Sequence, residues 1–365
     1  MSHIPHVVMV SWKGPRHPKR GGAELYTLSV LAGLADKGCR TTWLVPEVAG
    51  HPKDEVIGGV RVRRRGNRAT HLPHAWRYLL HQPYHVVIDQ VNAYPMLTSF
   101  FVKRDKGLLL VHQLTKEVWF FELPYPIAAL GYRTESWLLR PYRRWATVTV
   151  SDSTAADLYD LGFSDVTVVK NALPFTLPLQ RERTPPTKPH FVGLGRLVRM
   201  KRFEHLLDAF AEVRRRVPSA RLTLLGRGDT AYTRELAARV AATPGADLIN
   251  GASEARKYAL LEEATAVVAP SVREGWGLMV SEGHAFGTPS VAYRVPGLRD
   301  STAHGVDGLL TEATPAALAA AMLRLSQNPE LWQTLSQGAF ESAARLSAAR
   351  QVEAFYELVS ERFLG

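Results

Sequence analysis

Short apolar runs alternate with segments of helical periodicity along most of the 365 residues. The run 266–269 is followed by a turn and a helix-like segment, and the same order recurs at 191–217 and at 7–37. Strands buried on both faces give continuous apolar runs, and strands that alternate with helices form parallel sheets. The pattern therefore predicts an α/β fold with doubly wound parallel sheets.

A proline-rich stretch divides this alternation in two. Residues 174–189 hold five prolines and little periodic hydrophobicity, which is typical of a linker. The chain is also longer than one hydrophobic core usually supports. We therefore expect one Rossmann-like domain at 1–173, a second at 190–349 and a helix at about 350–365 with one apolar face.

The composition limits the class of partner and the compartment. Forty-five basic and thirty-four acidic side chains leave a net charge of +11, which suggests nucleic acid, anionic lipid or a phosphorylated substrate as partner. The single Cys39 excludes an internal disulfide and a cysteine-based metal cluster. No apolar run has the length of a signal-peptide core or a transmembrane helix. We expect a cytoplasmic protein, with surface contact to the inner face of the membrane left open.

The stretch R-E-G-W-G-L-M-V-S-E, 273–282, lies between a predicted strand and a predicted helix. Ligands of open α/β sheets collect beyond the carboxyl ends of the strands, and a helix N-terminus attracts phosphate. Gly275 and Gly277 let the backbone approach an anion, while Glu274 and Glu282 offer acceptors for hydroxyl groups. A helix start with two solvated acids would give the same local pattern.

Three further positions are candidates for binding or chemistry. Gly21 and Gly22 open the first helix after a basic loop, although the G-x-G-x-x-G spacing of nicotinamide and flavin sites is missing. Arg196 and Lys201 follow a strand and could hold a diphosphate leaving group, or could be solvated cations. His112 ends an apolar strand, where it is either a site residue or a satisfied structural histidine.

Several familiar catalytic motifs are absent from the sequence. There is no D-x-D triplet for a divalent ion on a nucleotide diphosphate, and no His or carboxylate stands at metal-ligand spacing from His112. There is also no G-x-S-x-G elbow and no G-x-x-x-x-G-K-[ST] loop, which argues against a serine hydrolase and a P-loop enzyme. We therefore expect no metal and no cofactor.

Residues 119–145 are unusually rich in aromatic and basic side chains. An amphipathic contact with an anionic membrane or a lipid-linked acceptor is one interpretation. Stacking of single-stranded nucleic acid between arginines is a second. The third is an aromatic helix pair that packs on the sheet with arginines at its rim.

Taken together and in order, these motifs resemble the family 4 glycosyltransferases. The matching stretches are G-G-A-E at 21–24, V-H-Q at 111–113, G-R-L-V-R-M-K at 195–201, E-G-W-G-L-M-V-S-E at 274–282 and G-T-P-S-V-A-Y with V-P-G-L-R-D at 287–300. The resemblance implies a retaining, metal-independent enzyme of the GT-B fold, with two Rossmann-like domains facing a crevice and a C-terminal helix crossing back to the first domain. It is strong in the second domain, which binds donor in this family, and thin in the first, which binds acceptor.

The resemblance also implies roles for individual residues. Arg196 and Lys201 would grip the diphosphate of a UDP- or GDP-sugar, and Glu274 would bond the hydroxyls of the transferred hexose. His112 would contact that sugar near the reacting carbon. The remaining donor-binding positions would be Gly21, Gly22, Gly251, Ala252, Gly275, Trp276, Gly277, Leu278 and Glu282, with Glu282 at the ribose. Asn-Ala-Leu-Pro at 171–174 departs from the Asn-Gly-Val-Asp common in the family, so a hinge role there is not implied.

The predicted function is transfer of a hexose to a hydroxyl group of a glycan, a lipid-linked sugar or a small molecule. A GT-B nucleotide-sugar epimerase is a second enzymatic hypothesis. From a different class, the net charge and the aromatic stretch allow a nucleic-acid-binding protein, which would bind oligonucleotides with a steep salt dependence.

Overall fold

The computed structural model describes residues 4–177, 183–228 and 230–364, so part of the predicted linker, 178–182, lies outside the described residues. Contacts divide the chain into two compact units. The N-terminal unit holds 1–116, 130–174 and 347–365, and the C-terminal unit holds 117–129 and 175–346. Within the described ranges, no helix combines the length and the apolar character needed to span a bilayer.

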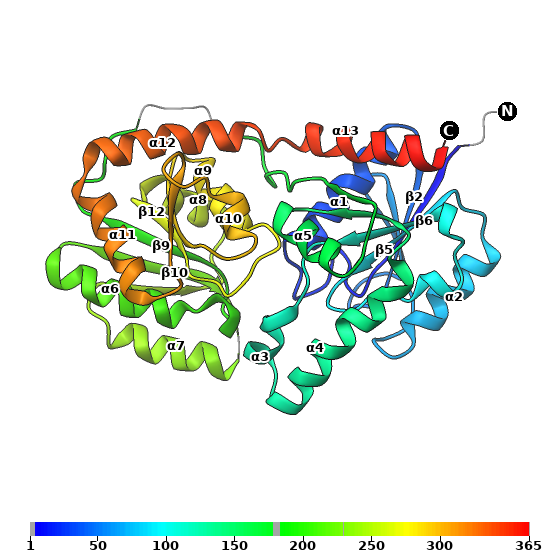
Figure 1. Ribbon diagram of the computed structural model, residues 1–365, viewed down its shortest axis with the longest axis horizontal. Helices are drawn as coiled ribbons and strands as arrows, with labels where there is room; N and C mark the ends of the chain where they lie inside the picture. The colour runs from blue at the N-terminus through cyan, green and yellow to red at the C-terminus, as the bar shows by residue number, and fades with distance from the viewer. Residues whose placement is uncertain (1–3, 178–182, 229, 365) are drawn as a thin grey trace. The chain divides into compact units, whose positions relative to one another are not determined.

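The N-terminal unit is built on an eight-stranded sheet in the order β3-β4-β2-β1-β5-β6-β7-β8. Figure 1 labels β2, β5 and β6 of this sheet. Its pairs are parallel except for β3 with β4. The five residues of the inner strand β1 are all buried, as expected for a strand covered on both faces. Its strands are β1 (His6–Val10), β2 (Arg40–Val45), β3 (Asp54–Ile57), β4 (Val60–Arg64), β5 (Val86–Val91), β6 (Gly107–Val111), β7 (Ala146–Thr149) and β8 (Val166–Val168).

The helices of this part of the chain include the C-terminal one. They are α1 (Gly22–Asp36), α2 (His71–His81), α4 (Tyr125–Leu139), α5 (Asp152–Asp160) and α13 (Ala348–Val359), and the division between the units falls within α4. The last helix, α13, packs on α1: Lys37 forms an ion pair with Glu353 at 2.9 Å, and Tyr26 contacts Phe355 edge to face. The return of the final helix to the N-terminal unit agrees with the predicted fold class.

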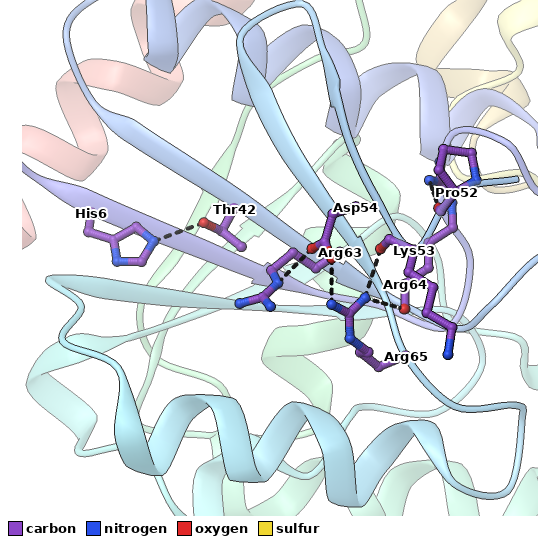
Figure 2. A network of polar contacts seen from close by, with 8 residues as sticks. All are labelled: His6, Thr42, Pro52, Lys53, Asp54, Arg63, Arg64 and Arg65. Carbon is purple, nitrogen blue, oxygen red and sulfur yellow. Dashed lines mark hydrogen bonds and ion pairs between the residues drawn. The ribbon is translucent and has the colours of Figure 1, made fainter.

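An edge hairpin carries a dense basic run, R-V-R-R-R at 61–65. Gly58 and Gly59, both with positive φ, make the tight turn between β3 and β4. Figure 2 shows Asp54 between two of the arginines: Arg63 Nε lies 2.9 Å and Arg65 Nη2 lies 2.5 Å from its carboxylate oxygens. Asp54 and Glu55 therefore pair with three of the four arginines of this run, Arg63, Arg64 and Arg65.

The C-terminal unit is a six-stranded parallel sheet in the order β11-β10-β9-β12-β13-β14. Its strands are β9 (His190–Arg196), β10 (Arg221–Arg227), β11 (Ala246–Asn250), β12 (Ala266–Ala269), β13 (Ser290–Tyr293) and β14 (Gly308–Thr311). Its helices are α6 (Phe203–Arg216), α7 (Ala231–Ala241), α8 (Glu254–Glu263), α9 (Leu278–His284), α10 (Leu298–Ser301), α11 (Pro315–Gln327) and α12 (Pro329–Ala344). Two apolar clusters cover the sheet, one around Phe203, Leu206 and Phe210 of α6 and one around Val280 of α9.

One segment does not follow the predicted division at residue 173. Residues 117–129, with the short helix α3 (Trp119–Glu122), belong to the C-terminal unit. Val118 packs in a small apolar cluster with Met200 and Val272, and Arg273 Nε lies 2.8 Å from Glu117. Apolar burial and an ion pair therefore hold this segment in the C-terminal unit, although its neighbours in sequence on both sides belong to the N-terminal unit.

Candidate functional site

The carboxyl edge of the C-terminal sheet carries an ion pair between two predicted site residues. Lys201 ends the short 3-10 helix η5 (Arg199–Lys201) beyond β9, and Glu274 follows β12, the neighbour of β9 in the sheet. The ammonium group of Lys201 forms an ion pair with Oε1 of Glu274. The two side chains are 9% and 11% exposed, so the pair is mostly withdrawn from water.

Two glycines let the chain pack closely against the two members of this pair. A Cβ at Gly195 would lie 3.1 Å from Cε of Lys201, and a Cβ at Gly297 would lie 2.1 Å from the carbonyl oxygen of Glu274. Gly297 also has a φ of +81°, and the N–H of Glu274 donates to the carbonyl of Pro296 at 3.0 Å. Sequence reasoning did not select Gly297, although its Pro-Gly dipeptide was a turn signal.

The turn between Glu274 and α9 is tightly packed. Gly277 precedes α9 with a φ of +91°, and a Cβ there would lie 2.9 Å from both Leu298 and Ser301. Trp276 is 4% exposed, and its indole N–H donates to Oγ of Ser281 at 2.9 Å. Trp276 therefore shapes the turn, whose other predicted positions are Gly275 and Leu278, the first residue of α9.

Glu282 lies in α9 and is held by a lysine that sequence reasoning missed. Lys257 of α8 places its Nζ 2.8 Å from Oε1 of Glu282. Burial raises the pKa of Glu282, and the charge of Lys257 opposes that shift. No sequence motif linked the two residues, which are brought together because α8 and α9 are neighbours.

Two more predicted positions follow β11. Gly251 has a φ of +92°, and a Cβ there would meet open space, while Ala252 packs against the cluster that contains Val280. Asn250 joins this strand end to the loop after β10, because its Nδ2 donates to the carbonyl of Gly228 at 2.8 Å. Gly251 is therefore exposed at the end of β11, with no side chain packed against it.

Arg196 lies at the end of β9, beside a second arginine. It is exposed and stands in register with Arg227, the last residue of β10. Two guanidinium groups and the Lys201 ammonium therefore gather at the ends of two adjacent strands. Cations in this position are suited to hold a phosphorylated ligand.

Three predicted site residues, Gly21, Gly22 and His112, belong to the N-terminal unit. Gly21 caps α1, but its N–H already donates to Oε2 of Glu24 at 2.6 Å, and Gly22 begins the helix. His112 shares a hydrogen bond with Gln90, Nε2 to Nε2 at 3.0 Å, and its ring packs at right angles to that of Tyr26, with the centroids 5.1 Å apart. Burial lowers the pKa of His112 to about 4, so its imidazole is neutral at pH 7.

Across the described residues, no three His, Cys, Asp or Glu side chains form a group suited to a metal ion. Beyond the two ion pairs of Lys201 with Glu274 and Lys257 with Glu282, Arg196 and Arg227 add positive charge at the carboxyl edge of the C-terminal sheet, which fits an anionic ligand.

Two doubly wound parallel sheets and a cationic strand edge define the class: the chain has the GT-B architecture. Comparison with known proteins gives the family. The model described as Glycosyl transferases group 1 matches residues 179–342, and the one described as Glycosyltransferase Family 4 matches residues 20–175. The two matches together cover most of the chain, which belongs to the family 4 glycosyltransferases.

Individual relatives match parts of the chain. The putative glycosyltransferase EpsD of Bacillus subtilis is 32% identical over 44% of this chain and 42% of its own length. A D-inositol 3-phosphate glycosyltransferase of Frankia alni is 37% identical over 41% of this chain and 40% of its own length. The matched segments thus span less than half of these relatives.

Solved structures match the fold over its full length. Sucrose-phosphate synthase from Thermosynechococcus elongatus superposes with a TM-score of 0.82 at 19% identity, covering 99% of both chains. Anabaena HepE, solved in complex with UDP and glucose, gives 0.74 at 16% identity, covering 98% of this chain and 100% of its own. At these identities the likeness concerns the fold alone.

Proposed function

We propose that the chain transfers a hexose from a UDP- or GDP-sugar to a hydroxyl acceptor, with retention of configuration and without a metal. The observation that carries the proposal is the pair of Lys201 and Glu274 at the carboxyl edge of the C-terminal sheet. One member of the pair suits a diphosphate and the other suits sugar hydroxyls, and the structure holds them in contact.

Lys201 would act on the leaving group. Negative charge grows on the diphosphate as the bond to the sugar breaks, and a fixed ammonium with little exposure stabilises that charge more than a solvated one does. Glu274 holds Lys201 in place beforehand, so little reorganisation is needed at the moment of reaction. Arg196 and Arg227, exposed at the neighbouring strand ends, would supply the remaining positive charge.

Glu274 would orient the transferred sugar. Its second carboxylate oxygen is an acceptor for hydroxyl hydrogen bonds, while Oε1 is engaged by Lys201. Glu282 would accept from the ribose and His112 would contact the sugar in its neutral form. With no side chain assigned as a covalent nucleophile, we propose front-face substitution, in which the departing phosphate helps to remove the acceptor proton.

Relatives support the donor class. HepE has been solved with UDP-glucose, and sucrose-phosphate synthase shares the fold over the whole chain. Metal independence rests on the family resemblance and on the absence of a D-x-D triplet from the sequence. The acceptor would be a glycan, a lipid-linked sugar or a small molecule, and a cytoplasmic location fits a chain with a single cysteine.

Thermal unfolding in EDTA with UDP, GDP, ADP and their sugars tests the donor proposal. A nucleotide at about a hundred times its Kd should stabilise the protein by about 2.7 kcal/mol, a shift of several degrees. Lys201→Met should lose most of the shift, whereas Lys188→Met, at the opposite end of β9, should keep it. No shift with any nucleotide would refute the proposal.

The effect of acceptor on the release of nucleoside diphosphate distinguishes transfer from epimerisation. A transferase releases nucleoside diphosphate faster when acceptor is added, whereas an epimerase changes the sugar without needing one. Release that does not respond to a panel of hydroxyl acceptors, together with a changed sugar configuration in the donor, would favour the epimerase.

A further inference from the structure

A stripe of four exposed side chains runs along α4 and into the turn after it. Leu130 and Trp137 are 63% and 60% exposed, and Arg133 and Arg140 are exposed between and beyond them. Their spacing of three, four and three residues places all four on one face of a helix. We call these residues, Leu130, Arg133, Trp137 and Arg140, the α4 stripe.

The opposite face of α4 is buried in the N-terminal unit. Gly131 and Leu139 are buried, and so is Glu135, the one acidic residue of this helix. The carboxylate of Glu135 accepts the backbone N–H groups of Thr115 at 2.5 Å and Lys116 at 2.9 Å. The one carboxylate of the helix therefore faces inward, and the four residues of the stripe are apolar or cationic.

Segments that contact the residues following α4 also expose basic and aromatic side chains. Arg104 donates from Nε to the carbonyl of Arg144 at 2.5 Å, and both arginines are exposed. Phe100 is 67% exposed, next to Ser99, whose N–H donates to the hydroxyl of Tyr142 at 3.4 Å. Two cations and one aromatic ring are thus exposed in segments that contact the residues following α4.

The stripe differs from the other basic run of the N-terminal unit. In the β3–β4 hairpin, Asp54 pairs with Arg63 and Arg65 (Figure 2). Among the residues that the structure describes, no ion pair joins Arg133 or Arg140 to a carboxylate. The positive charge of the stripe is therefore available to an external anion.

We propose that the α4 stripe docks on the surface of an anionic lipid bilayer. Tryptophan and leucine enter the boundary between headgroups and acyl chains, and arginines beside them bind lipid phosphates. A second copy of the chain fits less well, because matching stripes would oppose arginines to arginines. Single-stranded nucleic acid also fits less well, since the stripe offers one aromatic ring rather than a series for successive bases.

Docking of this kind is independent of the proposed transfer reaction. Its consequence for that reaction, that the acceptor is presented at a membrane, does rest on the proposed function. Donor hydrolysis in the absence of vesicles therefore separates the two: it should be equal in the wild type and in all stripe variants.

Vesicle flotation of the full-length protein tests the docking. The vesicles are phosphatidylcholine alone or mixed with phosphatidylglycerol. The wild type should float with the anionic vesicles at low salt and much less with the neutral ones. Arg133→Gln/Arg140→Gln should lower partitioning about thirtyfold, since each arginine near such a surface contributes about 1 kcal/mol. Leu130→Ser/Trp137→Ser should lower it about tenfold or more.

Two control variants remove the same kinds of exposed side chain from other parts of the surface. Arg215→Gln/Arg216→Gln takes two exposed arginines from α6, and Leu80→Ser/Val306→Ser takes two exposed apolar side chains, 62% and 51% exposed. Both controls should float like the wild type. Equal loss in the controls and the stripe variants, or no binding of the wild type to anionic vesicles, would overturn the proposal.

Two other outcomes would also overturn it. The first is a dimer in light scattering that the Leu130→Ser/Trp137→Ser variant dissociates, which would make the stripe a contact between copies. The second is salt-dependent binding of a single-stranded oligonucleotide that Arg133→Gln/Arg140→Gln abolishes while flotation stays unchanged.

Discussion

Removing one partner of the pair between Lys201 and Glu274 should affect stability and catalysis together. Lys201→Met leaves the Glu274 carboxylate, 11% exposed, without its counter-charge. Breaking a fully buried pair by removing one partner costs about 3–5 kcal/mol. Because a tenth of each side chain remains exposed, we expect about 3 kcal/mol for this substitution.

A double-mutant cycle isolates the interaction itself. Glu274→Gln keeps the shape of the side chain and removes its charge, so the double variant no longer contains an unpaired ion. Its loss of stability should be smaller than the sum of the single losses by about 1–3 kcal/mol. Urea unfolding followed by tryptophan fluorescence measures it, with Lys188→Met as the control for loss of a lysine.

The same variants should lose catalysis beyond what their stability explains. Removing one preorganised charge from a developing anion typically lowers the rate about 10²- to 10³-fold. We expect kcat/KM for the donor to fall by this amount in Lys201→Met under conditions where the variant is folded. Additive stability losses in the cycle, or a Lys201→Met variant with wild-type kcat/KM, would refute the reasoning.

Two further substitutions test other parts of the site. Gly297→Ala should destabilise the protein by about 2–4 kcal/mol in thermal unfolding, because a Cβ there meets the Glu274 carbonyl at 2.1 Å on a backbone with φ +81°. The control is Gly305→Ala, at a position with φ +80° and no neighbouring atom within 4 Å, which should cost only about 1 kcal/mol in the same assay. Since burial lowers the pKa of His112 to about 4 from 6.5, the unfolded chain gains a proton between pH 7 and 5 that the folded one does not. Wild-type stability should therefore fall over this range by about 1–2 kcal/mol more than that of His112→Gln, and equal falls would show that His112 is not held neutral.

The sequence predicted the central strands better than the edges of the sheets. The strand β12 has the bounds of the predicted run 266–269, because a strand covered on both faces is a continuous apolar run between turn residues. The edge strands β3, D-E-V-I, and β11, A-D-L-I-N, carry no such run. Their residues are partly exposed, so neither an apolar run nor a strict alternation marks them.

The candidate site was predictable as a set of residues but not as a set of contacts. Lys201 and Glu274 were selected from their motifs, yet they are 73 positions apart, and only the pairing of β9 with β12 brings them together. The partnership of Lys257 with Glu282 depends on how α8 packs beside α9, which local periodicity does not specify. Residues 117–129 were assigned by chain order to the N-terminal domain, whereas their apolar contacts lie in the C-terminal unit.

Donor turnover in EDTA is the most direct test of the proposed function. Wild-type protein is incubated with UDP- and GDP-sugars, with and without hydroxyl acceptors, and the release of nucleoside diphosphate is followed over time. We predict release from one of these donors that increases with acceptor, falls by at least about a hundredfold in Glu274→Gln, and is unchanged in Lys188→Met. Release that requires a divalent metal, or that is equal in Glu274→Gln and the wild type, would contradict the account.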